Sequence, residues 1–371
     1  QKTAYEISLG LVGSEMCIRD SDHSPIEQFM KISAIDNLRV FRNDEQLGFL
    51  HTCNRGAREA RGKDLVLLNN DTLVTDHSLD RLIETREAFP DAGLVGSKLV
   101  FPNGKLQEAG GVVWRDGSAL NYGHRGDPSD PRHAFAREAD YVSAAAVLIS
   151  ATTFADLGGF DENYAPAFYE DTDLAFRLRE AGMQVVYQPE STVIHFGGAS
   201  HGLDLDGPLK RHQVINAKTF QRRWHAALEE HLPPGPDVDR AALRLNGPRA
   251  LVVDAAMLTP DQDSGSLRMY NLLQVLRSLG FSVTFMPSNL ENRSEYVEPL
   301  QRQGIQVACS PHVNSTDRYL EEFGAEFELC IISRPDTAEK CLESARLLCP
   351  NALILYDTCL LYTSPSPRDR G

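Results

Sequence analysis

The sequence has few cysteines, no long apolar run and no excess of positive charge. Seven of its 371 residues are cysteine, and the five outside the two ends form no Cys-x-x-Cys pair. Neither a disulfide framework nor a structural zinc site is therefore predicted. No apolar run approaches the ~20 residues of a membrane span, and a formal net charge of −15 argues against a nucleic-acid partner. We expect a reduced, cytoplasmic protein.

The two ends of the chain are related to each other as DNA. Codons for Cys359–Asp369 can be chosen so that their reverse complement, in a shifted frame, encodes Leu11–Asp20. This relation resembles a transposase-type sequencing adapter, so we expect residues 1–21 and 359–371 to be non-native. A signal peptide is the alternative, but the apolar run at 8–13 is short and flanked by acidic residues.

Alternating strand and helix patterns between residues 22 and 231 predict an α/β domain. The apolar run that begins at Asp64 ends in Asn-Asn-Asp71, which is typical of a buried strand with a site at its C-terminal end. Other strands are predicted at 38–42, 93–100, 141–150, 185–187 and 192–195, helices at 50–62, 78–89, 171–181 and 209–231, and loops with a hairpin over 102–137.

A second α/β unit is predicted after a Pro-rich linker over 232–247. Residues 248–358 predict a Rossmann-like half domain, with strands at 250–254, 281–286, 327–332 and 352–356 and a helix at 267–279. The loop Thr259–Arg268 either receives a phosphate or a sugar oxygen at a helix N-terminus or is a plain capping turn.

Four polar motifs follow one another in the first domain. Leu68–Thr72 ends a strand, and its Asp can bind a cation that coordinates a diphosphate. The alternative is a simple Asn/Asp turn. Gly158–Glu162 marks a turn. Tyr169–Leu174 places three carboxylates at a helix start, where the helix dipole favours anions, although N-capping by Asp171 needs only one of them. His195 is a metal ligand or a structural histidine.

In this order the motifs resemble glycosyltransferase family 2, in particular its rhamnosyltransferase and O-antigen-type branch, over residues 22 to about 230. Leu47–Ala57 looks like the family's helix with an Asn-Arg-Gly motif beside the donor. Tyr141–Ala145 looks like its acceptor-side strand, with Ala144 where Gly is common. The resemblance implies a truncated GT-A fold whose first strands are missing, with Asp22-His-Ser24 as a remnant loop. Such a fragment is expected to bind its donor poorly and to be inactive by itself.

The resemblance implies inverting, metal-dependent sugar transfer from a nucleotide-diphosphate sugar to a saccharide or lipid-linked acceptor in surface-polysaccharide synthesis. A carboxylate can take the acceptor proton, and Mg²⁺ or Mn²⁺ can stabilise the departing nucleoside diphosphate. Peripheral association with the inner membrane face is compatible with such an acceptor. The implied roles are catalytic base for Asp171; orientation or acceptor contact for Glu170, Asp173, Asp161 and Trp114; donor binding for Asp22, Asn54, Gly56, Asn69 and Asn70; and metal binding for Asp71 and His195.

Residues 248–358 resemble the N-terminal half of family 4 GT-B glycosyltransferases, the half that mostly faces the acceptor. Two other functions stay open. A degenerate carbohydrate-binding or scaffold domain without catalysis would not need the set Asp71, Asp171 and His195. A dinucleotide-dependent oxidoreductase would need a Gly-x-Gly-x-x-Gly motif, and none follows the strand predicted at 250–254.

Overall fold

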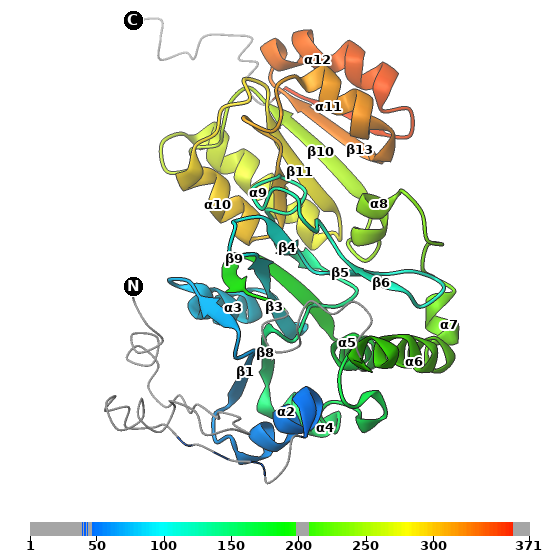
Figure 1. Ribbon diagram of the computed structural model, residues 1–371. Helices are drawn as coiled ribbons and strands as arrows, with labels where there is room; N and C mark the ends of the chain where they lie inside the picture. Colours follow the sequence, from blue (N-terminus) through cyan, green and yellow to red (C-terminus); the bar gives the residue numbers. More distant parts are fainter. Residues whose placement is uncertain (1–38, 40, 42, 44–46, 198–207, 359–371) are drawn as a thin grey trace, which may run out of the picture. The chain divides into compact units, whose positions relative to one another are not determined.

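The computed structural model describes residues 39, 41, 43, 47–197 and 208–358, and the chain divides into two compact units (Figure 1). The first unit comprises residues 1–128 and 138–245, and the second comprises 129–137 and 246–371. The two segments attributed to adapter DNA and the loop at Asp22 lie outside the described residues. Within those ranges, no helix combines the length and apolarity that crossing a membrane requires.

A mixed sheet forms the centre of the first unit, and it confirms the predicted α/β class. Its strands run in the order β1-β8-β3-β9-β2, with β4 beside β3. Only β3 and β9 pair in parallel within this path. The strands are β1 (Asp64–Leu68), β2 (Thr72–Val74), β3 (Ala92–Val100), β4 (Leu106–Glu108), β8 (Ala146–Ser150) and β9 (Gln184–His195), while β5 (Gly111–Val113) pairs with β6 (Ala119–Asn121) and β7 is Arg137–Glu138.

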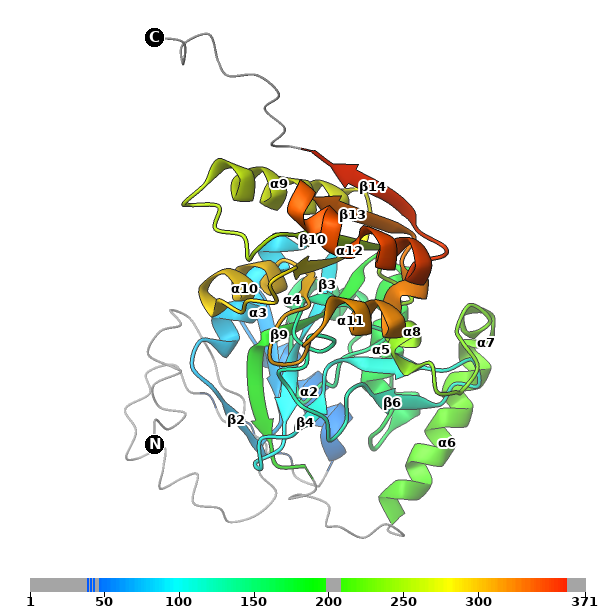
Figure 2. The same ribbon diagram turned by 90° about the horizontal axis from the view of Figure 1, so that it is seen from above.

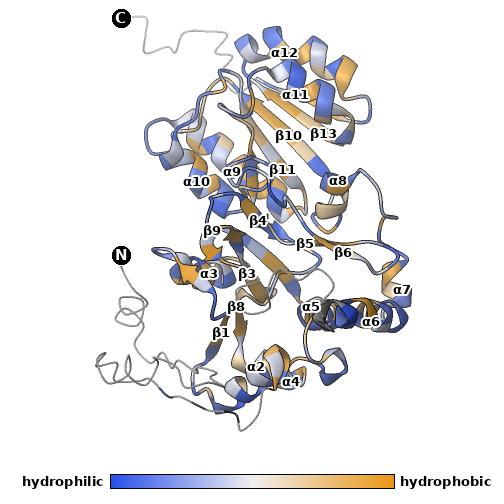
Figure 3. Ribbon diagram, in the orientation of Figure 1, coloured by the Kyte–Doolittle hydropathy of each residue, from blue (hydrophilic) through white to orange (hydrophobic). Residues whose placement is uncertain are grey.

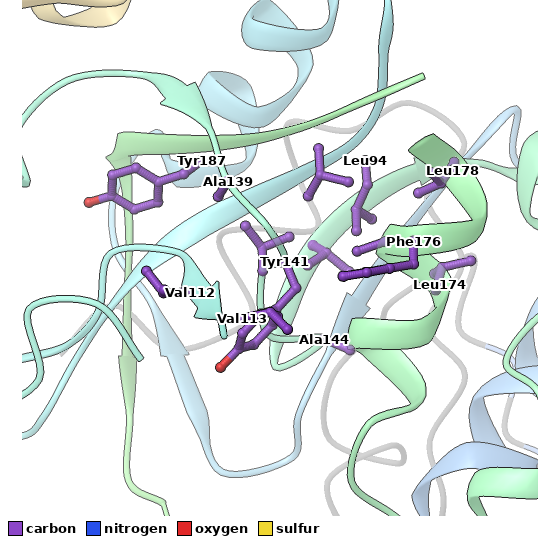
Figure 4. Close-up of a cluster of buried hydrophobic side chains, with 14 of the residues drawn as sticks. Leu94, Val112, Val113, Ala139, Tyr141, Ala144, Leu174, Phe176, Leu178 and Tyr187 are labelled. Atoms are coloured by element: carbon purple, nitrogen blue, oxygen red, sulfur yellow. The ribbon is translucent and has the colours of Figure 1, made fainter. Parts of the chain in front are cut away.

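Helices cover this sheet with their apolar sides. Figure 4 shows Leu174, Phe176 and Leu178 of one helix in the same buried cluster as Leu94 and Tyr141. Burial of each such side chain contributes roughly 1.5–3 kcal/mol. The helices are α2 (Gly48–Glu59), α3 (Ser78–Ala88), α4 (Ala151–Asp156), the 3₁₀ turn η1 (Glu162–Tyr164), α5 (Glu170–Glu180), α6 (Pro208–Arg223), α7 (His225–Leu228) and α8 (Val238–Ala242).

The region predicted as loops over 102–137 is well packed. Tyr141 lies directly over Gly111, where a Cβ atom would come within 1.9 Å of the tyrosine Cε1 atom. Any side chain at this position would displace the ring, so the close approach requires glycine. Trp114 follows β5 and is buried in the same apolar cluster.

The segment predicted as a linker over 232–247 is partly a folded element of the first unit. Ala241 and Ala242 of α8 are buried in the apolar core. Tyr122 donates a hydrogen bond of 2.5 Å to Asp239, and Arg244 donates one of 2.7 Å to Asp140. The Pro-rich start suggested a connection, but the alanines that follow supply an apolar face too short for periodicity to reveal.

The second unit is built on a parallel sheet of five strands in the order β12-β11-β10-β13-β14, three of which are labelled side by side in Figure 2. Its strands are β10 (Arg249–Asp254), β11 (Ser282–Pro287), β12 (Ile305–Val307), β13 (Leu329–Ser333) and β14 (Leu353–Asp357). Its helices are α9 (Ser264–Ser278), α10 (Ser294–Arg302), α11 (Thr316–Phe323), the 3₁₀ turn η2 (Gly324–Glu326) and α12 (Pro335–Leu348).

The second sheet is apolar on both faces, as buried parallel strands are. Alternate residues of β10 point to opposite sides: Ala250 and Val252 join a cluster with α9 and α10, and Leu251 and Val253 join one with α11 and α12. Figure 3 shows these strands as apolar ribbons between helices of mixed polarity.

Candidate functional site in the first unit

The loop between β1 and β2 carries the predicted metal-binding aspartate. Asn69 donates a backbone hydrogen bond of 2.9 Å to the carbonyl of Ala145, and the carbonyl of Asp71 accepts one of 2.9 Å from Phe196. The β2–β9 register places Thr72 opposite His195. The antiparallel pairing of β2 with β9 therefore brings Asp71 to the end of β9, although the two residues are far apart in sequence.

Asp71 and His195 lie side by side. The Nε2 atom of His195 is 3.2 Å from Oδ1 of Asp71, and both side chains are largely buried. The Nδ1 atom of His195 lies 3.1 Å from Oε1 of Gln107, an acceptor that favours the proton on Nδ1. In that tautomer Nε2 accepts a hydrogen bond of 3.4 Å from Nδ2 of Asn69 and lies beside Asp71, as in a metal-binding histidine held by a partner on its other nitrogen.

The donor set around Asp71 fits a divalent cation. Adjacent ligands of an octahedral ion, each ~2.1 Å from it, lie ~3 Å apart, which matches the spacing of Asp71 and His195. Asn69 turns its Nδ2 atom toward Nε2 of His195 at 3.4 Å, and its buried Oδ1 atom has no hydrogen-bond partner among the described residues. Across that same part of the chain, no three His, Cys, Asp or Glu side chains converge on one point. The protein thus supplies a partial set, which is usual for Mg²⁺ bound together with substrate phosphates.

Asp171 lies near the N-terminus of α5 and faces the segment that precedes β8. Its Oδ2 atom accepts a hydrogen bond of 3.3 Å from the backbone N–H of Ala144, and its Oδ1 atom accepts one of 2.7 Å from Thr172. Burial raises the pKa of Asp171, and these hydrogen bonds oppose that shift. The result is a carboxylate more basic than an exposed aspartate, which suits a proton acceptor.

Three consecutive residues before β8 connect the separate parts of this site. Ser143 donates its backbone N–H to Glu108 at 2.8 Å, Ala144 donates to Asp171, and Ala145 accepts from Asn69. The residues 143–145 are named the connecting segment below. They place the Asp71 loop and Asp171 along one stretch of backbone.

Glu108 and Gln107 are site residues that the sequence did not reveal. They are neighbours on β4, and Gln107 reaches His195 while Glu108 reaches Ser143. Both lie within a Gly-rich region predicted as loops, where no acidic cluster or periodic pattern marks them. The only available signal was an acid next to the small residues Ala109, Gly110 and Gly111.

Glu170 is a buried acid beside the predicted base. Its Oε2 atom has no partner in the described part of the protein. Burial, and then the charge of Asp171, raise the pKa of Glu170 well above its usual range. A neutral carboxyl group that can donate a hydrogen bond is therefore available next to Asp171.

Asp173 and Asp161 are held by packing contacts rather than aimed at an open site. Asp173 is fully buried; it accepts hydrogen bonds of 2.7 Å from Arg177 Nε and 2.9 Å from Trp224 Nε1. Asp161 caps η1 by accepting from the backbone of Asn163 and pairs with Arg223. Trp114, the third of these predicted contacts, is a core residue. All three contribute to the framework around the site.

The predicted donor-binding residues are spread over several environments. Asn54 of α2 is buried, and its amide donates to the carbonyl and accepts from the N–H of Phe160, both at 2.8 Å. Both polar atoms thus already have backbone partners, and they hold the turn at Gly159. Gly56 lies in the same helix, Asn70 is exposed beside Asp71, and Asp22 is outside the described residues.

The loop after β10 in the second unit behaves as a capping turn. Asp263 accepts the backbone N–H of Ser266 at 2.8 Å and the hydroxyl of Thr259 at 3.0 Å. The Ser266 hydroxyl also donates to Asp263, at 2.5 Å. This bond contributes most to lowering the pKa of Asp263, and the other two add to the shift. Its carboxylate therefore sits where a phosphate would bind, beside a cavity of about 200 Å³ that is also lined by Arg293 and Arg334.

Buried acids, an Asp–His pair and a shared backbone segment in a mixed α/β unit are features of an enzyme site. The family model described as "Glycosyltransferase like family 2" matches residues 16–213, more than half of the chain. The protein belongs to this glycosyltransferase family.

Several curated proteins are similar to the chain. It is 29% identical over 234 residues to protein y4gI of Sinorhizobium fredii, covering 60% of this chain and 25% of that one. It is 37% identical over 160 residues to the O-antigen biosynthesis protein RfbC of Myxococcus xanthus, covering 41% and 12%. It is 26% identical over 183 residues to the N-acetylglucosaminyl-diphospho-decaprenol L-rhamnosyltransferase of Mycobacterium tuberculosis, covering 44% and 58%. The chain thus spans less than two thirds of each.

Among solved structures, GalNAc-T7 with UDP, GalNAc and Mn²⁺ aligns with a TM-score of 0.47 and 14% identity, over 58% of this chain and 44% of that one.

Proposed function

We propose that the first unit is a GT-A domain that catalyses inverting transfer of a sugar from a nucleoside-diphosphate sugar to a saccharide or lipid-linked acceptor in surface-polysaccharide synthesis. The relatives named for O-antigen biosynthesis and for rhamnosyl transfer support this substrate class. The observation that carries the proposal is the connecting segment, which links Asp171 and the Asp71 loop through adjacent residues.

In this mechanism Asp171 accepts the proton of the acceptor hydroxyl as its oxygen attacks the anomeric carbon. The bond between that carbon and the diphosphate oxygen breaks, and the nucleoside diphosphate leaves with the electron pair. A single displacement of this kind inverts the configuration at the anomeric carbon. Glu170, kept neutral by burial, can orient the acceptor or Asp171 by donating a hydrogen bond.

Asp71 and His195 would hold the divalent cation, with Asn69 beside them. Mg²⁺ or Mn²⁺, when bound, would supply charge stabilisation for the departing diphosphate. Gln107 fixes the imidazole of His195 with Nε2 toward Asp71, so the pair is oriented before the donor arrives.

The test is transfer or hydrolysis of nucleotide sugars by the full-length enzyme that contains this domain, with and without EDTA. We expect turnover with Mg²⁺ or Mn²⁺ and its loss in EDTA, restored by excess metal. Donor turnover that is unaffected by EDTA would contradict the metal assignment. A protein that binds saccharide without turning over any nucleotide sugar would favour the non-catalytic alternative.

The same proposal extends to the rest of the chain. The second unit would be the N-terminal half of a GT-B glycosyltransferase, which its five-stranded parallel sheet supports. The terminal segments 1–21 and 359–371 would be adapter-derived, and the nucleotide record tests this directly.

We further propose that the protein is cytoplasmic and peripheral to the membrane. Helix α6 supports this, because it has basic residues, no acidic ones, and exposed Val214 and Ile215. Sedimentation with anionic-lipid vesicles tests that association.

A further inference from the structure

Glu108 is a deeply buried carboxyl group near the proposed site that has no role in the mechanism above. Its side chain lies on β4 and is 1% exposed. Its Oε1 atom accepts the backbone N–H of Ser143 at 2.8 Å. Burying a carboxyl group is costly, so its presence here, where an apolar residue would pack without that cost, calls for a reason.

We propose that Glu108 is a positioning residue of the transferase site, which fixes Asp171 by holding the connecting segment at Ser143. The next N–H along that segment, from Ala144, donates to Asp171, and the next carbonyl, from Ala145, accepts from Asn69. Displacement of Ser143 therefore displaces the hydrogen-bond partners of Asp171 and of the Asp71 loop together. This inference rests on the proposed role of Asp171.

Glu108 performs this role in its neutral form. Burial, and then the charge of Asp171, raise the pKa of Glu108 to about 8, although the hydrogen bond from Ser143 opposes the shift. Other ionisable groups around this pair are Glu170, Tyr141 and Tyr169, each of which interacts with Asp171, and Tyr141 also interacts with Glu108. As pH rises through about 8, Glu108 gains a negative charge beside Asp171, and this added charge would repel an incoming diphosphate.

The strand β4 serves both halves of the site because successive side chains of a strand point to opposite faces. Gln107 reaches the imidazole of His195 from one face, and Glu108 reaches Ser143 from the other. One short strand therefore orients the proposed metal ligand and, through backbone, the proposed base.

The first test needs no turnover. In the full chain with ¹³C-labelled carboxyl groups, NMR titration should show a Glu108 midpoint near pH 8, assigned by its loss in Glu108→Gln. The midpoint should move to lower pH in Asp171→Asn, because the neighbouring charge is gone. Glu138→Gln is the control and should leave the Glu108 midpoint unchanged: Glu138 is a half-buried acid with a pKa raised to about 7, but its charged neighbours are Arg179, Arg244 and Asp140. A Glu108 midpoint unmoved by Asp171→Asn would overturn the inference.

The second test compares two variants with different chemistry. Glu108→Ala removes the acceptor for Ser143 and should lower kcat roughly 10–100-fold, as misplacement of a catalytic group by about 1 Å does, with little change in the donor KM. Glu108→Gln keeps an acceptor oxygen and stays neutral, so it should retain most of kcat. We expect kcat/KM of the unaltered full-length enzyme to fall as pH rises through about 8, and Glu108→Gln should lack that fall.

The outcomes separate the two levels of the proposal. Equal impairment of Glu108→Gln and Glu108→Ala with an unchanged pH profile would show that Glu108 is only a packing residue. Full activity of Glu108→Ala would also overturn its role. If the full-length enzyme turns over no nucleotide sugar, the proposed function fails, and the NMR titration still decides whether Glu108 and Asp171 are coupled.

Discussion

Acidic side chains in the two units differ in how completely they are paired. In the second unit, Asp254 and Asp357 lie at the ends of β10 and β14, and each pairs with an arginine at 2.7 Å. In the first unit, Glu170 has an oxygen without a partner in the described structure, and Glu108 accepts one backbone hydrogen bond while it faces Asp171.

This difference shows where the chain accepts an energetic cost. A buried polar atom without a partner typically costs 1–3 kcal/mol, and like charges held together add to that. In the second sheet, the ion pairs of Asp254 and Asp357 with arginines offset the cost of placing these acids there. Burial raises the pKa of Asp254 as well, but its pairing with Arg334 opposes that shift. The first unit keeps incompletely paired acids with raised pKa values at one edge, which is typical of a site that must exchange protons or ligands.

The largest expected effect is on turnover. Asp171→Asn keeps the shape of the side chain and removes its basicity, so kcat should fall roughly 10²–10⁴-fold, measured by steady-state transfer in a protein with full donor binding. Donor affinity should change little. Glu170→Gln is the matched control and should be milder. Near-normal turnover of Asp171→Asn beside an inactive Glu170→Gln would reverse the two assignments.

The next effect is on stability within the same acidic cluster. Asp173→Ala leaves the largely buried Arg177 and the Trp224 indole without their carboxylate. Removal of one partner of a buried pair typically costs about 3–5 kcal/mol. Chemical denaturation should show this loss as a lower midpoint. If stability is unchanged and turnover is lost, Asp173 would act in the site, as the sequence suggested.

A smaller loss is expected at the turn before η1. Asn54→Ala leaves the buried N–H and C=O of Phe160 unpaired and should destabilise the unit by about 1–3 kcal/mol. Asn54→Asp keeps the acceptor for the N–H only, so its loss should differ from that of alanine. A change in donor KM at unchanged stability would instead support the predicted donor contact.

The smallest effect is expected in the second unit. Asp263→Ala removes the N-cap of α9 and should cost about 1 kcal/mol with no effect on turnover by the first unit. Because folding lowers the pKa of Asp263, its contribution is present above the pKa of the unfolded chain and disappears as pH falls through the lower folded value. Thermal unfolding at pH 7 and pH 3 measures this contribution. If Asp263→Ala stabilises the protein in phosphate buffer, the loop would instead be an anion-binding site.

Regular elements were predictable from sequence, and the site geometry was predictable only in part. The apolar runs of β10 and β13 and the period of α9 need no tertiary information. The strand predicted over 141–150 is shorter, since β8 begins at Ala146. The amides of Ser143 and Ala144 donate to carboxylates instead of a neighbouring strand. Side chains from distant segments therefore determine where that strand begins.

The β9 strand shows a second limit. The sequence predicted strands at 185–187 and 192–195, separated by Pro189. The structure has one strand in which the pairing with β3 jumps from Gln188 to Thr192. Proline cannot donate to the ladder, so it lies in this bulge, and the strand continues beyond it to place His195.

The packing of α8 and Trp224 has a practical consequence for protein production. The family match ends at residue 213, and a recombinant version trimmed there would lack Phe220, Trp224, Leu228, Ala241 and Ala242, all of which are buried in the first unit. It would also leave Asp173 without its indole partner. Such a protein would expose a wide apolar surface and should be recovered from inclusion bodies, whereas one extended through residue 245 keeps these contacts.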